Sequence, residues 1–224
     1  MSAGPTREPL DPVRFLSNYS TGYMGAQLAT EALARGHRVT VVSGPIAEPL
    51  PPRARTIHVE RAGEMERALH RLAGRADAII MAAAVCDFRP ARPSPTKLPR
   101  RAHLTLKLEA TPDLLAGLPR RPGQVVAGFS VESGAVVSRA MRKLRRKRLD
   151  LLLAQRAGGR SPFGRRPVQA WLLARGGEAK RLGTISKPAV ARLLLDKIET
   201  LWYGQQRPKV ESKLQKAQRR GEAD

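Results

Sequence analysis

The amino-acid sequence predicts an α/β protein with a doubly wound, mostly parallel, Rossmann-like sheet. Its expected strands are short, nearly continuous apolar runs, which is the pattern of strands buried on both faces. Helical patterns of about a dozen residues separate these runs, as crossover connections between parallel strands require. A proline-rich stretch interrupts the alternation and predicts a flap loop, and a small β extension completes the expected fold.

The first half of the chain alternates regularly between helix and strand. A helix is expected at 24–35, because apolar residues recur on one face and Gly36 follows. The strand expected at 38–43 ends at Gly44-Pro45, a pair that marks a turn. Further along the chain, the sequence predicts a strand at 55–60, a helix at 63–73 and a buried strand at 78–83.

The second half begins with the proline-rich stretch at 88–101, which predicts a mobile flap rather than a helix or a central strand. Thr111-Pro112-Asp113 has the order of an N-cap, a first-turn proline and a first-turn acid, which predicts the start of a helix. The other expected elements are strands at 104–108, 124–129, 149–154 and 168–173 and helices at 134–148 and 187–201. Residues 1–203 are expected to form one domain, and residues 204–224 a basic, disordered tail.

Composition narrows the class of protein. The single cysteine, Cys86, allows neither an intrachain disulfide nor a cysteine-based zinc site, and the histidines lack the spacing of helical metal ligands. No apolar run reaches the ~18–20 residues of a membrane span, and the first residues lack a signal peptide's apolar stretch, so a cytoplasmic protein is expected. The net charge of +22 suggests anionic partners, but only 4% of residues are aromatic, which disfavours nucleic acid as the main ligand.

The segment from Ser17 to Gly25 is a candidate phosphate site. It is small and polar, contains the hydroxyls of Ser20 and Thr21, and leads into a helix whose free N–H groups attract anions. An ordinary N-cap with a tightly packed glycine would have the same spacing. A nicotinamide dinucleotide is disfavoured, because its fingerprint needs an acid at the end of the next strand, where Ser43 stands.

Three further segments contain candidate ligands of a nucleotide. Ala82–Ala84 follow a buried strand and leave room for a flat ligand, and Asp87 could accept hydrogen bonds from a ribose, although the same acid could cap a turn. Lys97 on the flap could close over phosphates or be one solvated lysine among many. Lys143 and Lys147 share one face of an expected helix, as a polyphosphate clamp or a solvated face would require.

Several stretches of the sequence occur in the order of a known enzyme family. These are Gly4–Asn18, Ser20–Gly25, Ala82–Pro90, Thr111–Leu114, Gly128-Phe129, Lys143-Leu144, Lys147, Asp150, Phe163-Gly164 and Ser186-Lys187. Together they resemble phosphopantothenate–cysteine ligase, which in bacteria is commonly the C-terminal half of a bifunctional coenzyme A biosynthesis flavoprotein. The resemblance covers residues 4 to about 202, nearly the whole chain, and so implies a ligase-like nucleotide-binding domain.

The resemblance implies a two-step reaction. The carboxylate of 4′-phosphopantothenate attacks the α-phosphate of CTP, or of ATP in some members, and an acyl-nucleotidylate and pyrophosphate result. The amine of cysteine then displaces the nucleotide. CTP is the favoured co-substrate, Mg²⁺ normally accompanies it, and no FMN is implied.

By matching position, the resemblance also implies roles for individual residues. Asn18, which would hold the intermediate through its amide, and Lys97 are the implied catalytic residues. The implied nucleotide ligands are Ser20, Gly22, Ala83, Asp87, Lys97, Thr111, Pro112, Asp113, Leu114, Phe129, Lys143 and Lys147. The implied substrate ligands are Asn18 and Ala84, and no residue is implied as a metal ligand. The family further implies a homodimer whose sites draw on both subunits, and a separate decarboxylase in the pathway.

The sequence departs from the family pattern at several positions. Tyr23 stands where a lysine is usual, Lys97–Arg100 replace a Lys-x-Lys-Lys flap, and Gln155 replaces an asparagine. Only Met1–Ala3 precede the first motif, where a hydrophobic strand is usual, so either the start lies upstream or the sheet lacks that strand. These departures motivate an alternative function, a catalytically degenerate paralogue that binds nucleotide or nucleic acid through its basic surface.

Overall fold

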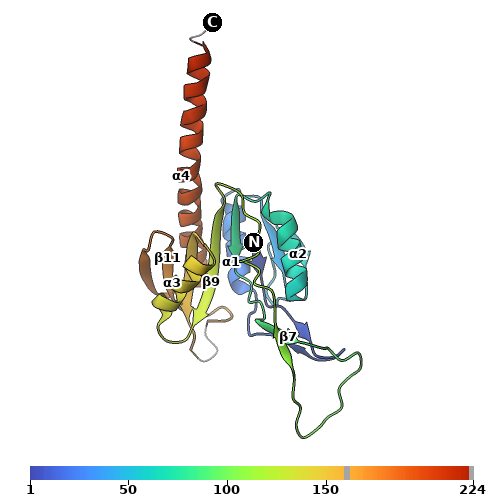
Figure 1. Cartoon of the computed structure of the whole chain (residues 1–224). Helices are drawn as coiled ribbons and strands as arrows, with labels where there is room; N and C mark the ends of the chain where they lie inside the picture. The colour runs from blue at the N-terminus through green and yellow to red at the C-terminus, as the bar shows by residue number, and fades with distance from the viewer. Residues whose placement is uncertain (159–161, 222–224) are drawn as a thin grey trace.

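The computed structural model describes residues 1–158 and 162–221, with side chains described up to residue 205. Figure 1 shows one sheet flanked by helices, a set of short strands and loops projecting from one end, and a long C-terminal helix. The helices are α1 (Tyr23–Ala34), α2 (Ala62–Ala73), α3 (Val136–Arg146) and α4 (Lys187–Gly221). The strands are β1 (Ser2–Ala3), β2 (Glu8–Pro9), β3 (Phe15–Leu16), β4 (Thr40–Ser43), β5 (Arg55–His58), β6 (Ala78–Met81), β7 (Phe88–Pro90), β8 (Leu108–Ala110), β9 (Val125–Glu132), β10 (Leu151–Arg156), β11 (Val168–Ala174) and β12 (Ala179–Ile185).

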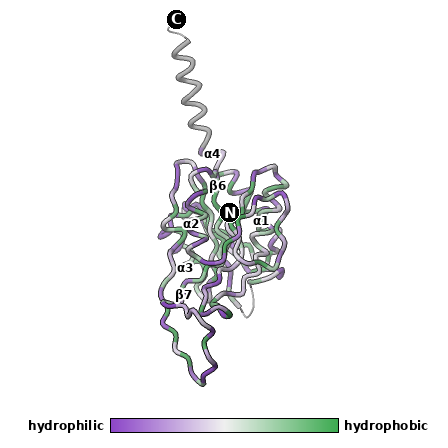
Figure 2. Tube along the Cα trace, turned by 90° about the vertical axis from the view of Figure 1, so that its right-hand side faces the viewer, coloured by the Kyte–Doolittle hydropathy of each residue, from purple (hydrophilic) through white to green (hydrophobic). Residues whose placement is uncertain are grey.

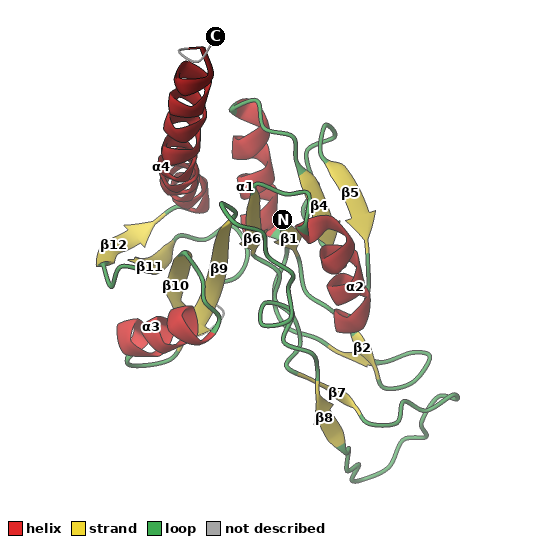
Figure 3. Ribbon diagram, turned by 45° about the horizontal axis from the view of Figure 1, so that its top comes forward, coloured by secondary structure: helices red, strands yellow, loops and turns green. Residues whose placement is uncertain are grey.

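The central sheet has eight strands in the order β12-β11-β10-β9-β6-β1-β4-β5 (Figure 3). The strands from β5 to β10 in this order run parallel, whereas β11 pairs antiparallel with both of its neighbours, β10 and β12. Buried side chains of α1 and α4 pack on one face of the sheet, and those of α2 and α3 pack on the other. This is the doubly wound arrangement, and it confirms the predicted fold class.

The two apolar layers explain why the strands read as continuous apolar runs. On β9, Val126 packs with α2 and α3, whereas its neighbours Val125 and Ala127 pack with α1 and α4. Successive residues therefore face different layers, and both faces need apolar side chains. Figure 2 shows apolar segments gathered in the body of the domain. Within the described residues, every helix falls short of the length and hydrophobicity that crossing a bilayer would need.

The helix predicted from Thr111 is wrong, because the chain forms only a turn over residues 114–117. The Thr111 hydroxyl donates to the backbone carbonyl of Cys86 instead of capping a helix. The Asp113 carboxylate accepts hydrogen bonds from the N–H groups of Leu115 and Ala116, but Gly117 and Pro119 follow at once. Glycine and proline both disfavour a helix interior. The chain therefore has the residue pattern of a helix N-terminus at Thr111–Asp113, but no helix follows it.

The structure also corrects the strand predictions. Residues 104–107 form a loop, and pairing with β7 begins only at Leu108. β12 was not predicted, because Lys180, Arg181 and Gly183 give it no apolar alternation. β1 lies between β4 and β6 although it has only two residues, so this place in the sheet is filled. The backbone of α4 is helical as far as Gly221, and the basic tail expected at 204–224 stays a prediction.

The short strands β2, β3, β7 and β8 and the flap between the last two form a projecting arm, which we define as residues 8–16 and 88–110 (Figure 1). Asp11 organises it, since its carboxylate accepts hydrogen bonds from the N–H groups of Val13 and Arg14, both at 2.8 Å, and from the Arg14 guanidinium. The N–H group of Leu98 also donates to Asp11, at 3.1 Å, and ties the flap to the turn. The Arg14 guanidinium holds the pKa of Asp11 well below its usual value, so this anchor stays charged at neutral pH.

Both edges of the sheet carry basic side chains. β5 forms one edge and exposes Arg55 and His58, and β12 forms the other and exposes Lys180 and Arg181. The register between β12 and β11 also shifts beside Gly183, whose φ is 67°. Charge and irregularity of this kind make an edge strand a poor template for a further strand.

Candidate functional site

A cleft of about 600 Å³ opens beyond the carboxyl ends of the parallel strands, where ligands bind in sheets of this type. Its walls come from the start of α1, the segment after β6, the last residues of β9, the turn before β9, α3 and the loop after β10. The predicted site residues that line it are Asn18, Ser20, Gly22, Ala83, Ala84, Asp87, Thr111, Pro112, Asp113, Leu114, Phe129, Lys143 and Lys147. The structure therefore brings together every predicted site residue except Lys97.

The N-terminus of α1 forms one wall of the cleft. Gly22 has a φ of 84°, in the left-handed region, and a Cβ atom there would clash with the side chain of Ile46. The hydroxyl of Ser20 accepts a hydrogen bond from the N–H group of Gly22 at 3.4 Å, and Thr21 accepts one from Tyr23 at 3.3 Å. No acid occupies the first turn of α1, so the positive end of the helix dipole is open to an anion.

Asn18 joins this wall to the segment that follows β6. Its amide nitrogen donates to the carbonyl oxygen of Ala84 at 2.6 Å, and its amide oxygen accepts from the N–H group of Ser20 at 3.4 Å. Ala84 is held from the other side as well, because its N–H group donates to Gly4 at 2.9 Å and its carbonyl accepts from Thr6 at 3.3 Å. The two predicted substrate ligands, Asn18 and Ala84, are thus in direct contact and rigidly placed.

The opposite wall is held together by ion pairs. The ammonium of Lys147 lies 3.1 Å from the carboxylate of Asp113, and that of Lys143 lies 3.0 Å from Glu132. Burial alone would raise the pKa of Asp113, but the hydrogen bond and charge of Lys147 outweigh it and lower that pKa. The Arg120 guanidinium donates to the carbonyl oxygen of Lys147 at 2.6 Å and fixes the end of α3. Both predicted lysines are therefore held at the cleft by carboxylates.

Asp87 and Phe129 lie between these walls. Asp87 is exposed, and its backbone carbonyl accepts a hydrogen bond from the N–H group of Thr111 at 3.0 Å. This bond connects the segment after β6 to the turn that carries Asp113. Phe129 is half-buried near the end of β9, where it packs against the apolar layer of α1 and α4. A carboxylate and an aromatic ring therefore both line the cleft.

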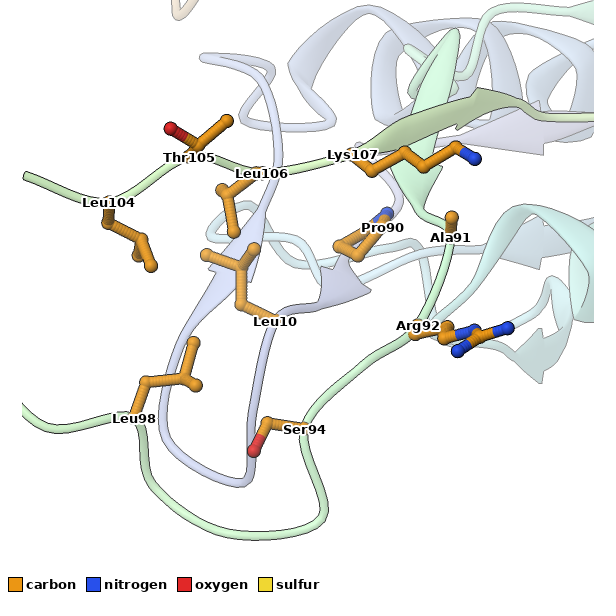
Figure 4. A pocket seen from close by; sticks show the side chains of 10 residues that line it. All are labelled: Leu10, Pro90, Ala91, Arg92, Ser94, Leu98, Leu104, Thr105, Leu106 and Lys107. Atoms are coloured by element: carbon orange, nitrogen blue, oxygen red, sulfur yellow. The ribbon is translucent and has the colours of Figure 1, made fainter.

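Lys97 is the predicted residue that the structure places elsewhere. It is exposed on the arm, where its neighbour Leu98 is tied to Asp11. A second cavity, of about 500 Å³, lies under the flap, and Figure 4 shows the side chains of Leu10, Leu98 and Leu106 pointing toward one another there. Anchored in this way, the arm holds Lys97 away from the other predicted residues.

The cleft also contains residues to which the sequence analysis gave no role. These are Tyr23, Met24, Met81, Val85, Leu115, Ser130, Val131, Arg146, Leu149, Leu152, Gln155, Pro162, Phe163, Gly164 and Lys187. Phe163-Gly164 and Ser186-Lys187 were among the matching stretches, and that was the available signal. The buried hydroxyl of Ser130 has no hydrogen-bond partner among the described atoms. Arg146 and Lys187 therefore add two basic side chains to the cleft, while most of the other added residues are apolar.

The acidic residues of the cleft show how the Mg²⁺ that the resemblance implies could be bound. Among the described residues, no group of three or more His, Cys, Asp or Glu side chains could hold a metal ion. Asp87 and Asp113 are the acids of the lining, and Asp113 is already paired with Lys147. Mg²⁺ usually binds through one or two carboxylates together with substrate phosphates. The residues thus fit an ion that arrives with a nucleotide.

Comparisons with known proteins identify related sequences over nearly the whole domain. Residues 1–201 match the family described as the DNA/pantothenate metabolism flavoprotein C-terminal domain. The chain is 43% identical over 162 residues to the coenzyme A biosynthesis bifunctional protein CoaBC of Escherichia coli, covering 69% of this chain and 39% of that protein. It is 37% identical over 218 residues to CoaBC of Mycobacterium tuberculosis, covering 91% of this chain and 52% of that protein. The chain thus spans about half, or less, of the length of these relatives.

Solved structures share the fold. The crystal structure of the C-terminal domain of a CoaBC protein has a TM-score of 0.76 at 32% identity and covers 91% of this chain and 94% of that one. A Cab2 variant in complex with phosphopantothenate-cysteine has a TM-score of 0.72 at 17% identity, covering 92% and 87% of the two chains, and supports the fold alone. These matches confirm the resemblance seen in the sequence. The chain belongs to the family of DNA/pantothenate metabolism flavoprotein C-terminal domains.

Proposed function

We propose that this domain is a ligase that joins 4′-phosphopantothenate to cysteine through an acyl-nucleotidylate. The observation that carries the proposal is the single cleft in which an open helix N-terminus, Asn18, Asp87 and two lysines of α3 converge. The names of the related proteins, which refer to coenzyme A biosynthesis, support the same reaction. CTP is the favoured co-substrate, with ATP as the other candidate.

In the first proposed step, a carboxylate oxygen of 4′-phosphopantothenate attacks the α-phosphorus of the nucleotide. A new P–O bond forms, the bond to the β-phosphate oxygen breaks, and pyrophosphate leaves. In the second step the amine of cysteine attacks the acyl carbon, the nucleoside monophosphate leaves with the bonding electrons, and the nitrogen loses a proton. The mixed anhydride is needed because a free carboxylate is a poor electrophile.

Individual residues support these steps in distinct ways. The α1 N-terminus with Ser20 and Gly22 binds phosphate, and Lys143 and Lys147 neutralise its charge. Asp87 accepts hydrogen bonds from the ribose. Phe129 and the turn from Thr111 to Leu114 contact the base, while Asn18 orients the acyl group near Ala83 and Ala84. Mg²⁺ bound to the phosphates would supply charge neutralisation, and the ligation itself has no need of FMN.

Pyrophosphate release tests the proposal directly. Purified protein with Mg²⁺ and 4′-phosphopantothenate is expected to release pyrophosphate from CTP faster than from ATP, and to form a cysteine-containing product only when cysteine is present. Mass spectrometry of the product identifies the ligation. A folded sample that binds nucleotide but releases no pyrophosphate with either one would contradict the ligase and favour the degenerate paralogue.

We further propose that the active form is a homodimer assembled through the arm. The arm exposes large apolar side chains, namely Val13, Phe15, Phe88, Leu104, Leu106 and Leu108. Such a group of exposed apolar side chains marks an interaction surface, and the basic edges of the sheet disfavour pairing there. Because Lys97 lies on the arm and away from its own cleft, a dimer of this kind would allow it to serve the cleft of the second subunit.

Replacing two apolar side chains of the arm tests the dimer. The double variant Val13→Glu, Leu104→Glu is expected to sediment as a monomer, since both side chains are more than half exposed and the new charges would be buried at the interface. Its melting temperature should change little. Val137→Glu, an exposed apolar residue of α3 outside the arm, is the control and should leave the oligomer unchanged. Equal masses for the two variants would exclude the arm as the interface.

A further inference from the structure

Lys187, the first residue of α4, has a buried ammonium group at the cleft. The residue lines the cleft but is only 4% exposed. Its ammonium donates to the carbonyl oxygen of Pro162 at 2.6 Å and to that of Gly164 at 2.5 Å. None of the ion pairs formed by the described side chains includes Lys187. Two of its three protons thus bind neutral oxygens, and its charge has no adjacent carboxylate.

The loop held by Lys187 packs against the start of α1. The ring of Phe163 lies 6.3 Å from the ring of Tyr19, and the Arg165 guanidinium lies 5.6 Å from the ring of Tyr23. The Lys187 ammonium lies 6.0 Å from that same Tyr23 ring. Fixing the loop therefore also fixes the surroundings of the α1 N-terminus, where phosphate is proposed to bind.

The charged and titratable groups around Lys187 do not neutralise the positive charge of its ammonium. Tyr23 faces it from α1, Arg165 comes from the loop before β11, and Glu48 comes from the segment after β4. Glu48 is already paired with Arg165, at 3.0 Å. The N-terminus of α4 adds a further positive partial charge beside the ammonium. Among these described groups, the one carboxylate near the ammonium is thus already paired with another cation.

A buried cation of this kind is unfavourable for the fold by itself. Burial lowers the pKa of Lys187 to about 8, and the attraction of Glu48 opposes this effect only in part. An apolar side chain could fill the same space without the free-energy cost of removing a charged group from water. A cation retained in a cleft with a perturbed pKa indicates a ligand of opposite charge.

We propose that Lys187 is a positioning residue and an anion contact of the cleft, which holds the wall from Pro162 to Gly164 and directs its remaining proton at a phosphate group bound beside Ser20 and Gly22. The naming of that phosphate as part of a nucleoside triphosphate rests on the proposed function. The anion site itself does not, because inorganic pyrophosphate can probe it without any reaction.

The charge of Lys187 predicts a specific pH dependence of anion binding. Below about pH 8 the ammonium is already protonated, so affinity should not vary through this group. Above that pH, binding must take up a proton, and affinity should fall by up to about tenfold per pH unit. A lysine that only supported the loop would make no such contribution.

Calorimetric binding of inorganic pyrophosphate from pH 6.5 to 9.5 provides the test. Lys187→Met is expected to weaken binding at pH 7 by about tenfold or more and to abolish the additional loss above pH 8, while Lys187→Arg should retain most of the affinity at pH 7. Lys180→Met, which removes an exposed lysine of β12, is the matched control and should bind within about twofold of the unmodified protein. The control also reports the titration of pyrophosphate itself.

Two results would overturn the proposal. One is a folded Lys187→Met protein that binds pyrophosphate as tightly as Lys180→Met does. The other is a pKa of Lys187 that does not change when the unmodified protein is saturated with pyrophosphate, as measured by NMR of its lysine side chains. An anion in contact with the ammonium must raise that pKa. Normal, Lys187-dependent binding without ligation would instead refute only the proposed function.

Discussion

Asn18→Ala is expected to reduce product formation by about 10²–10³-fold while nucleotide binding changes by less than about threefold. The Asn18 side chain lies between the α1 N-terminus and Ala84, where the acyl group is proposed to lie. Removing its amide deletes a fixed dipole at the reacting group but leaves Lys143, Lys147 and the helix N-terminus in place. Pyrophosphate release and calorimetric titration with CTP measure the two effects separately.

The matched control for this variant is Ser17→Ala. The hydroxyl of Ser17 donates to the carbonyl oxygen of Thr6 at 2.8 Å, so the control also removes one bond between a side chain and the backbone of this region. Ser17 does not line the cleft. Full activity of Asn18→Ala would contradict the role of Asn18, and an equal loss in both variants would show that the effect comes from the local backbone.

Gly44→Ala is expected to lower the free energy of unfolding by roughly 3 kcal/mol or more, and the melting temperature by about 10 °C. Gly44 follows β4, and its N–H group donates to the carbonyl of Ala3 at 3.0 Å. A Cβ atom at this position would overlap the carbonyl oxygen of Pro5 and lie 2.9 Å from its carbonyl carbon. Because these are backbone atoms just beyond the carboxyl ends of the paired strands β1 and β4, no side-chain rotation relieves the clash. Calorimetry or thermal denaturation followed by circular dichroism measures the loss.

The same substitution at Gly74 serves as the control. Gly74 ends α2 with φ −65° and ψ −13°, and a Cβ atom there would meet nothing within 4 Å. An alanine fits this conformation, so Gly74→Ala should stabilise the fold by about 0.4–1 kcal/mol through the unfolded state. Similar melting temperatures for the two variants would mean that β1 and β4 can separate at little cost.

The repeating part of the fold could be predicted from the sequence because each core element has a periodic signal. The strands around Val41 and Val126 are buried on both faces, so they read as apolar runs, and α1 has its apolar residues on one face before Gly36. β12 could not be predicted, because its pairing with β11 depends on backbone hydrogen bonds and its side chains are mostly exposed. The turn after Thr111 was missed because a contact with Cys86, distant in sequence, overrides the local signal.

The candidate site was predictable to a similar extent and for a different reason. Its residues lie near or beyond the carboxyl ends of neighbouring parallel strands, so Asn18, Asp87 and Phe129 were expected to lie at one edge of the sheet once the fold was known. Lys97 could not be placed, since the position of the arm depends on Asp11, which has no periodic signal. Lys187 belongs to a matching stretch, Ser186-Lys187, but it received no role because no local pattern distinguishes a buried lysine from the other basic residues of a highly charged chain.

The basic side chains on β5 and β12 bear on how the protein behaves when it is concentrated. Two molecules that approach edge to edge bring Arg55 or Lys180 of each together, and this repulsion opposes the growth of intermolecular cross-β structure. The repulsion acts through solvent, so its range contracts from about 10 Å at 0.1 M ionic strength to about 3 Å at 1 M. Colloidal stability of this domain is therefore greatest in dilute buffer, and high salt removes the barrier that keeps its sheets apart.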